Sequence, residues 1–308
     1  MASTQSMKHI GLFEGIGGFS LAAEWMGWET VAWCEWNEFC QTVLKYHLPN
    51  AKGYGDIKKT DFKQYANKIG LLTGGFPCQP FSTAGEQLGE EDERFMFPEM
   101  FRAIREIKPK WIVAENVYGL LTKKFRPTLE NIYSSLEDEG YEMFPPLVLP
   151  ASAVNAPHER NRLWIIAHSN QVSGQNGELG ENRSSEGKSE SIQEQRERFR
   201  IFASRISEAG FIAYTDSIGQ SGSGRPEGQI GSEKKRNWEA SWFNTNGRWP
   251  TQSPICDGDD GFSSRLDTTA ISKKKWTEQS LQAGGNAIVP QVAMEIFKAI
   301  NSFNLLKF

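Results

Sequence analysis

A cysteine flanked by prolines is the residue of this chain best suited to nucleophilic chemistry. Cys78 lies in the run GGFPCQPFS at residues 74–82, directly after a short apolar segment. A lone cysteine is usually an inert buried thiol. The prolines favour a different interpretation, because they restrict the backbone and remove hydrogen bonds that a strand would need. In such a loop the thiol is partly exposed, and backbone dipoles can favour the reactive thiolate.

A second group of residues is typical of a nucleoside pocket. Residues 13–19, FEGIGGF, form a glycine-rich turn whose backbone N–H groups could approach a ligand closely. A glycine-rich turn alone is a weak indication of such a pocket, because plain tight turns and dinucleotide sites use similar loops. Glu35 could accept hydrogen bonds from ribose hydroxyls, Trp36 could stack on an adenine, and Asp56 could accept from an exocyclic amine. Together they predict a nucleoside pocket at the carboxyl edge of a sheet.

The elements that must position these residues can be read from the apolar pattern. Apolar runs alternate with amphipathic segments between residues 8 and 167. Strands are predicted at residues 9–13, 30–34, 71–73, 111–114, 147–149 and 163–166, and helices at 19–26, 38–46, 98–107 and 290–303. This alternation predicts an α/β fold with a mostly parallel sheet.

The composition changes sharply after His168. Residues 169–237 are rich in Gly, Ser, Gln, Glu and Arg and contain few strand-forming runs. That composition is typical of an irregular or partly disordered segment. We therefore expect an α/β region over residues 1–168, a polar insert over 169–270, and a terminal segment over 271–308 that returns to the first region.

Length, charge and cysteine content limit the class of protein. The 308 residues suffice for one large domain or two modest ones. No apolar stretch approaches ~20 residues and residues 1–8 lack the apolar core of a signal peptide, so we expect a cytoplasmic protein with free thiols. Four cysteines without a Cys-x-x-Cys pair, and only four histidines, argue against a metal site. The net charge of −4 gives no support to nucleic-acid binding, which usually needs basic surface.

Five ordered motifs resemble those of the cytosine-C5 DNA methyltransferase family. The run around Cys78 resembles the family's nucleophile motif residue for residue over GFPCQPFS. The other four are LFEGIGGF at 12–19, AENV at 114–117, HERNR at 158–162 and GNAIVP at 285–290. The resemblance implies a Rossmann-like, S-adenosylmethionine-dependent catalytic domain formed by residues 1–168 plus 271–308. It also implies a target-recognition domain over residues 169–270.

The resemblance also implies a role for individual residues. Cys78 would attack C6 of a flipped-out cytosine, and Glu115 would hydrogen-bond the ring and supply a proton. Arg162 would hold the ring O2, with Arg160 close by. The implied cofactor-binding residues are Phe13, Gly15, Gly17, Glu35, Trp36, Asp56, Ile57, Pro80 and Asn286. Residues 82–97 are expected to form a loop that closes over the base. Because Glu115 must be protonated at neutral pH, burial or a nearby anion should raise its pKa.

Three positions depart from the family pattern. Gly11 stands where the family usually has Asp, which puts the cofactor contacts in doubt. His158 replaces the usual Gln ahead of the two arginines, which puts the support of the catalytic loop or base in doubt. Residues 273–276, KKKW, do not resemble the family's ninth motif, which leaves the join between the two domains open.

Other functions remain as alternatives. A tRNA cytosine-C5 methyltransferase of the same family would share the chemistry, but the chain lacks the Cys-Phe-Thr tripeptide of those enzymes. A non-catalytic DNA-binding relative would not need Cys78, Glu115 and Arg162, and a nicotinamide oxidoreductase would not need the proline-flanked cysteine. We therefore expect a monomeric bacterial or phage enzyme acting on double-stranded DNA. A cognate restriction endonuclease acting on the same site is a further partner that the resemblance suggests.

Overall fold

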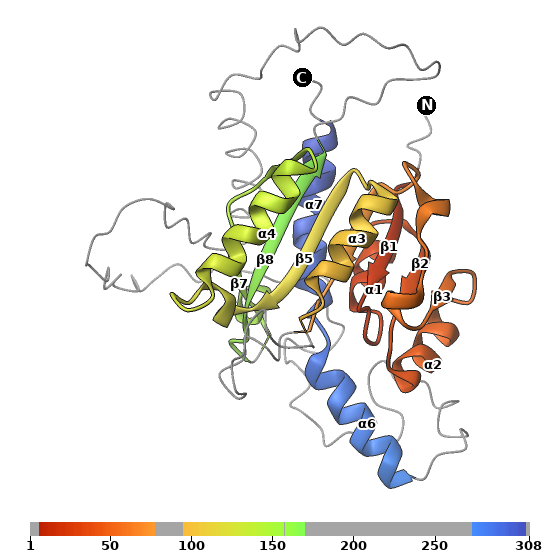
Figure 1. Cartoon of the computed structure of the whole chain (residues 1–308). Coiled ribbons are helices and arrows are strands. Elements are labelled where there is room, and N and C mark those ends of the chain that lie inside the picture. The colour runs from red at the N-terminus through yellow and green to blue at the C-terminus, as the bar shows by residue number, and fades with distance from the viewer. Residues whose placement is uncertain (1–5, 78–94, 157, 170–272, 306–308) are drawn as a thin grey trace, which may run out of the picture.

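The fold is built on a mixed sheet. A computed structural model of the chain describes residues 6–77, 95–156, 158–169 and 273–305 (Figure 1). In this part of the chain eight strands form one sheet in the order β3-β2-β1-β4-β5-β8-β6, and β7 also pairs with β8. The strands are β1 (Lys8–Leu12), β2 (Glu29–Cys34), β3 (Lys52–Tyr54), β4 (Leu71–Gly74), β5 (Trp111–Val117), β6 (Tyr141–Met143), β7 (Leu147–Pro150) and β8 (Asn161–Ser169).

The parallel half of the sheet contains a topological switch point. Strands β3, β2, β1, β4 and β5 are parallel neighbours, whereas β8 runs antiparallel to β5 and pairs with β6 and β7. The chain leaves β1 toward β2 on one side and leaves β4 toward β5 on the other. Open α/β sheets bind ligands outside the carboxyl ends of the strands at such a point. The expected α/β class and mostly parallel sheet are confirmed.

Helices cover both faces of the sheet. They are α1 (Gly18–Trp25), α2 (Glu38–His47), α3 (Phe97–Ile107), α4 (Arg126–Asp138), α6 (Lys273–Asn286) and α7 (Pro290–Leu305). Figure 1 shows α3 and α4 in front of the sheet and α7 behind it. No helix of the described residues is long and apolar enough to cross a membrane.

Side chains alternate between the two faces along the central strands. On β5, Trp111 and Val113 belong to one buried cluster and Ile112 and Ala114 to the other. All four are at most 2% exposed. Burying a side chain such as Ile112 or Val113 stabilises a fold by about 1.5–3 kcal/mol. The period of two therefore sets which side of β5 faces α3 and α4 and which faces α1 and α7.

The terminal helix packs on the first helix. Phe297 and Ile300 of α7 lie in the same buried cluster as Phe19 and Ala23 of α1. The indole N–H of Trp111 donates to Oδ1 of Asn304 at 3.1 Å. These contacts bring the end of the chain back to its beginning.

A buried histidine links the three central strands. The ring nitrogens of His9 lie 2.9 Å from Oγ1 of Thr30 on β2 and 2.8 Å from Oγ1 of Thr73 on β4. Burial lowers the pKa of His9 to about 3. The imidazole is therefore neutral at physiological pH, as a fully buried ring without a counter-charge requires.

Some elements were not predicted from the sequence. Strands β3 and β6 have 3 residues each, too few to display an apolar period. Helix α4 buries Thr128, Leu129, Ile132 and Leu136, a helical spacing that the prediction missed. Strand β5 was predicted to end at residue 114, which is wrong, because it continues to Val117 and therefore carries Glu115.

Candidate active site

The glycine-rich loop after β1 is held in a left-handed backbone conformation at alternate residues. The φ angles are 52° at Phe13, 58° at Gly15 and 96° at Gly17. Glycine adopts such angles readily, but a residue with a side chain at positive φ costs about 1–3 kcal/mol. The surroundings must therefore hold Phe13 in place.

Glu35 is one of the residues that hold this loop. It follows β2 directly, and its Oε2 accepts a hydrogen bond from the backbone N–H of Gly15 at 2.7 Å. Its Oε1 accepts from the N–H of Asn37 at 2.8 Å. Each carboxylate oxygen has further acceptor capacity, so ribose hydroxyls could still be bound. The adjacent Trp36 side chain is 72% exposed and open to stacking.

Asp56 and Ile57 begin a short 3-10 segment, η1 (Ile57–Lys59), after β3. The Asp56 side chain caps it by accepting from the N–H of Lys58 at 3.0 Å. Ile57 is 4% exposed and lies in the core. Ile57 is therefore a core residue at the start of this turn, whereas Asp56 is partly exposed.

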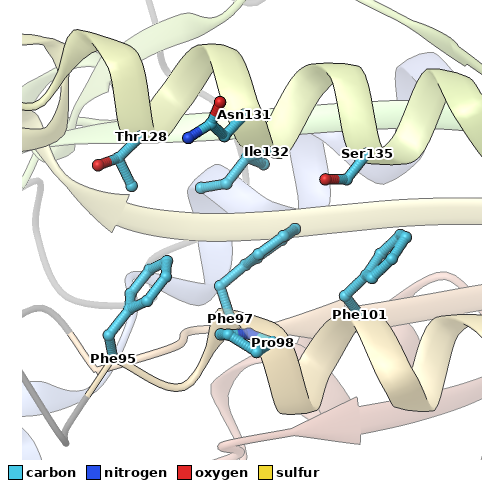
Figure 2. Close-up of a pocket in the computed structure, with 8 residues that line it drawn as sticks. All are labelled: Phe95, Phe97, Pro98, Phe101, Thr128, Asn131, Ile132 and Ser135. Atoms are coloured by element: carbon cyan, nitrogen blue, oxygen red, sulfur yellow. The ribbon is translucent and has the colours of Figure 1, made fainter. Parts of the chain in front are cut away.

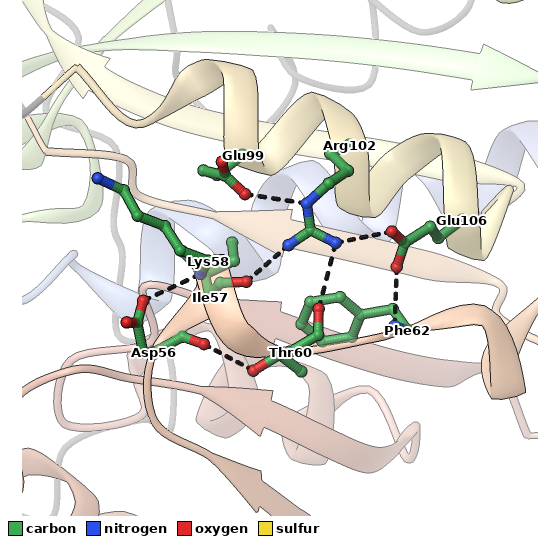
Figure 3. Close-up of polar contacts among 8 residues, drawn as sticks. All are labelled: Asp56, Ile57, Lys58, Thr60, Phe62, Glu99, Arg102 and Glu106. Carbon is green, nitrogen blue, oxygen red and sulfur yellow. Dashed lines mark hydrogen bonds and ion pairs between the residues drawn. The ribbon is translucent and has the colours of Figure 1, made fainter.

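Arg102 of α3 fixes this turn from the opposite side (Figure 3). Its guanidinium donates to the carbonyl oxygens of Ile57 at 2.6 Å and Thr60 at 3.1 Å. The same group pairs with Glu99 at 2.9 Å and Glu106 at 2.7 Å. Five N–H donors in a fixed fork make Arg suited to such a hub. The sequence analysis gave Arg102 no role, because a contact between residues 45 positions apart has no local pattern.

Glu115 and Arg162 form a close ion pair across β5 and β8. The Nε atom of Arg162 lies 2.8 Å from Oε1 of Glu115, and the two side chains are 26% and 12% exposed. Val117 is directly opposite Arg162, so Glu115 is its diagonal neighbour on the same face. The antiparallel register therefore brings together two residues that the sequence analysis had linked only through the resemblance.

Two opposing effects act on the Glu115 carboxyl. Burial raises the pKa of Glu115, while the positive charges of Arg162 and Arg160 lower it. Burial is the larger effect, and the pKa stands above its ordinary value. This is the direction that a proton-donating carboxyl requires.

The end of β4 lies beside this carboxyl. A β-carbon placed on Gly75 would stand 3.5 Å from Oε2 of Glu115. The buried side chain of Asn116 donates from Nδ2 to the carbonyl oxygen of Phe76 at 3.2 Å. Asn116 thus ties the strand that carries Glu115 to the segment that leads to the predicted nucleophile, a role that the sequence analysis missed. Cys78 and Pro80 themselves lie outside the described residues.

Arg160 binds the terminal motif rather than Glu115 directly. Its Nη2 donates to the carbonyl oxygens of Gly285 at 3.0 Å and Ala287 at 2.7 Å. Asn286 between them is the last residue of α6. A β-carbon on Gly18 would stand 2.6 Å from Cγ1 of Ile288, which places the terminal motif directly over the start of α1.

Two of the three departures from the family pattern are residues 273–276 and His158. Residues 273–276 begin α6, and Trp276, 5% exposed, packs with Phe39 and Val43 of α2. Ile16 of the glycine-rich loop packs against the same cluster. His158 is exposed. Helix α6 therefore packs against the same cluster as the glycine-rich loop.

A separate groove of about 220 Å³ opens between α3 and α4 (Figure 2). Three phenylalanines line one side and residues of α4 line the other; the lining residues are Phe95, Phe97, Pro98, Phe101, Thr128, Asn131, Ile132 and Ser135. None of them belongs to the five motifs. The candidate site is therefore defined by the strand ends and their hydrogen bonds, not by this groove.

The sequence profile of C-5 cytosine-specific DNA methylases matches residues 7–258. The chain belongs to this family. Among related methylases, the type II methyltransferase M.Eco47II of Escherichia coli is 42% identical over 163 residues, covering 52% of this chain and 39% of that protein. The type II methyltransferase M.HhaI of Haemophilus parahaemolyticus is 36% identical over 171 residues, covering 55% of this chain and 51% of that protein.

The similarity to these methylases covers only part of each protein. The matched region spans about half or less of the length of both relatives. Among solved structures, a mutant of Spodoptera frugiperda DNMT2 is 25% identical, with a TM-score of 0.43, covering 57% of this chain and 54% of that one. The methylase profile includes the glycine-rich loop, Glu115 and both arginines, whereas the terminal motif at 285–290 lies beyond it.

Proposed function

We propose that the chain transfers a methyl group from S-adenosylmethionine to C5 of a flipped-out cytosine in a specific sequence of double-stranded DNA. The observation that carries this proposal is the partly buried Glu115–Arg162 pair, 2.8 Å apart, beside the end of β4. A carboxyl and a guanidinium at this point suit a pyrimidine ring, which offers N3 and O2 along one edge. The family membership supports the same assignment.

The residues around the switch point fit S-adenosylmethionine. The carboxylate of Glu35 and the exposed ring of Trp36 suit a nucleoside, and Asp56 can accept from an exocyclic amine. Phe13, Gly15 and Gly17 shape the loop beneath, while Ile57, Pro80 and Asn286 would complete the pocket. When bound, the cofactor supplies an electrophilic methyl group.

The protein residues make the cytosine ring reactive. The Cys78 thiolate adds to C6, and the electron pair of the C5–C6 bond becomes available at C5. Glu115 donates its proton to N3, so no negative charge remains on the ring, and Arg162 holds O2. C5 would then take the methyl group, with S-adenosylhomocysteine as the leaving group. A base removes the C5 proton, N3 returns its proton to Glu115, the C5–C6 double bond re-forms, and the C6–S bond breaks to return the Cys78 thiolate.

Two segments that lie mostly outside the described residues carry the remaining proposals. Residues 169–270 would recognise the target sequence, since Arg, Lys, Gln and Asn suit phosphate and base contacts. Residues 82–97 would close over the flipped base. A restriction endonuclease that cuts the same sequence is the proposed partner.

Methyl transfer from tritiated S-adenosylmethionine tests the proposed reaction. The protein is incubated with mixed duplex DNA or with tRNA, beside a Cys78→Ala variant. We expect 5-methylcytosine in DNA and none with the variant. Label in tRNA alone would replace the substrate but keep the mechanism. No label in either would favour a non-catalytic DNA-binding protein, and a nicotinamide retained on purification would favour an oxidoreductase.

A further inference from the structure

Glu14 is a buried acid inside the cofactor loop to which the proposed reaction gives no role. Its side chain is 4% exposed, and its Oε1 accepts a hydrogen bond from the backbone N–H of Ser20 at 2.8 Å. Ser20 is the third residue of α1, whose N-cap position is occupied by Gly17, a residue without a side chain to cap the helix. The carboxyl of Glu14 thus satisfies an N–H of the first turn that would otherwise have no side-chain acceptor.

The position of this carboxyl depends on Gly11. Ile10 and Leu12 of β1 face the cluster packed against α3 and α4, so residue 11 faces the other side, toward α1. A β-carbon on Gly11 would collide with Oε2 of Glu14 and stand 2.5 Å from its Cδ. The Glu14 carboxyl therefore occupies the space that any side chain at residue 11 would take.

Two acids hold the loop from opposite sides. Glu35 accepts from the N–H of Gly15, and Glu14 accepts from the start of α1. Between them Phe13 keeps its positive φ of 52°. A ribose bound at Glu35 would use the remaining acceptor capacity of that carboxylate, whereas the Glu14 carboxyl is buried against the start of α1 and stays engaged there. Glu14 is thus placed to keep the loop in shape while Glu35 binds the ligand.

We propose that Glu14 is a positioning residue of the cofactor loop and that Gly11 is its obligatory partner. Gly11, which departs from the family pattern, is then coupled to Glu14, because the Glu14 carboxyl occupies the space beside this glycine. The positioning role stands on contacts within the described chain. Only the identity of the ligand rests on the proposed function.

Hydrogen exchange in the ligand-free protein tests the positioning role. In Glu14→Ala we expect the backbone amides of residues 13–20 to exchange about tenfold faster, because the cap is lost. Glu14→Gln keeps an acceptor oxygen of the same shape and should stay within about threefold of the wild type. Glu24→Gln changes an exposed acid on α1 and is the matched control.

The coupling to Gly11 is tested with a double-mutant cycle. Gly11→Ala should displace the Glu14 carboxyl and weaken binding of S-adenosylhomocysteine, measured by calorimetry, by about tenfold. Glu14→Ala should weaken it by a similar factor, and Gly11→Ala combined with Glu14→Ala should be no worse than either change alone. Circular dichroism and thermal unfolding establish that each variant is folded.

The results distinguish the positioning role of Glu14 from the identity of the proposed cofactor. Additive losses in the cycle, or unchanged exchange in Glu14→Ala, would overturn the positioning role. If the wild type does not bind S-adenosylhomocysteine, the proposed cofactor is wrong, but the exchange experiment still decides the role of Glu14. Loss of binding in Glu14→Gln equal to that in Glu14→Ala would also count against positioning by shape and hydrogen bonding.

Discussion

Glu115 shows how a single residue acquires a function from its environment. Water exclusion favours the neutral acid, and the Arg162 guanidinium favours the anion. Burial has the larger effect here, so the carboxyl keeps a proton at a pH where an exposed glutamate would lose it. The Arg162 guanidinium, 2.8 Å away, then serves to orient the Glu115 carboxyl.

Glu115→Gln should reduce methyl transfer roughly 10²–10⁴-fold, because the amide keeps the shape but cannot donate a proton. Binding of S-adenosylhomocysteine should stay close to that of the wild type. Tritium incorporation into DNA and calorimetry measure the two effects. Glu130→Gln, an exposed acid paired with Arg126, is the control. Equal losses of methyl transfer in Glu115→Gln and Glu130→Gln would show that Glu115 does not act as the proton donor.

At the scale of elements, His9 joins β1, β2 and β4 through two threonine hydroxyls. Its pKa of about 3 in the folded chain compares with 6.5 in the unfolded chain. The unfolded chain therefore takes up a proton first as the pH falls. Stability from this group is fully present above pH 6.5 and decreases as the pH falls toward 3, with a limit of about 5 kcal/mol.

Urea unfolding of the wild type and His9→Gln between pH 7.5 and 4.5, values chosen to bracket the unfolded pKa, measures this contribution. We expect the wild type to be more stable at neutral pH and the difference in unfolding free energy to shrink as the pH falls. Other titrating groups affect both proteins alike and cancel in the difference. Parallel pH curves would show that His9 does not cause the acid sensitivity.

Arg102 connects helix α3 to the turn that contains Ile57 and Thr60. Arg102→Ala removes the donors that hold the carbonyls of Ile57 and Thr60, so the turn bearing Asp56 should lose its fixed position. We expect roughly tenfold weaker binding of S-adenosylhomocysteine, as for the loss of charged hydrogen bonds. Arg105→Ala, which changes a more exposed arginine on the same helix, should bind normally. Normal binding of S-adenosylhomocysteine by both variants would show that Arg102 does not position the turn for ligand binding.

In the whole molecule, the C-terminal elements pack beside the glycine-rich loop. The terminal motif lies against α1 through Ile288, and Arg160 holds two carbonyls of that motif. Helix α6 adds the contact of Trp276 with α2. Residues that are far apart in the sequence therefore surround the loop that we propose binds the cofactor.

Arg160→Ala should detach the terminal motif and lower Tm by about 3 °C, with weaker binding of S-adenosylhomocysteine. Arg160→Lys keeps the charge but not the forked donors, so it should restore the binding only in part. Differential scanning calorimetry and titration calorimetry give the two quantities. If Arg160→Ala binds the ligand as the wild type does but loses methyl transfer, the arginine acts on the base instead.

The α/β class, the order of the main elements and the family follow from patterns of neighbouring residues. Strands and helices carry their period of two or 3.6 in neighbouring residues, and the five motifs are contiguous runs. Asp56, Glu35 and the glycine-rich loop could be assigned to one sheet edge because parallel strands end on the same side. Whether Cys78 acts as the nucleophile stays a prediction.

The residues that support the candidate site depend instead on contacts between distant parts of the chain. Arg160 meets Ala287 across 127 residues, and Arg102 meets Ile57 across 45, so no local spacing announces either contact. The sequence marked Gly11 as a departure, but only packing brings the Glu14 carboxyl into the space that this glycine leaves. Such contacts are set by how the helices pack on the sheet, because side chains distant in the chain become neighbours only when the core is buried.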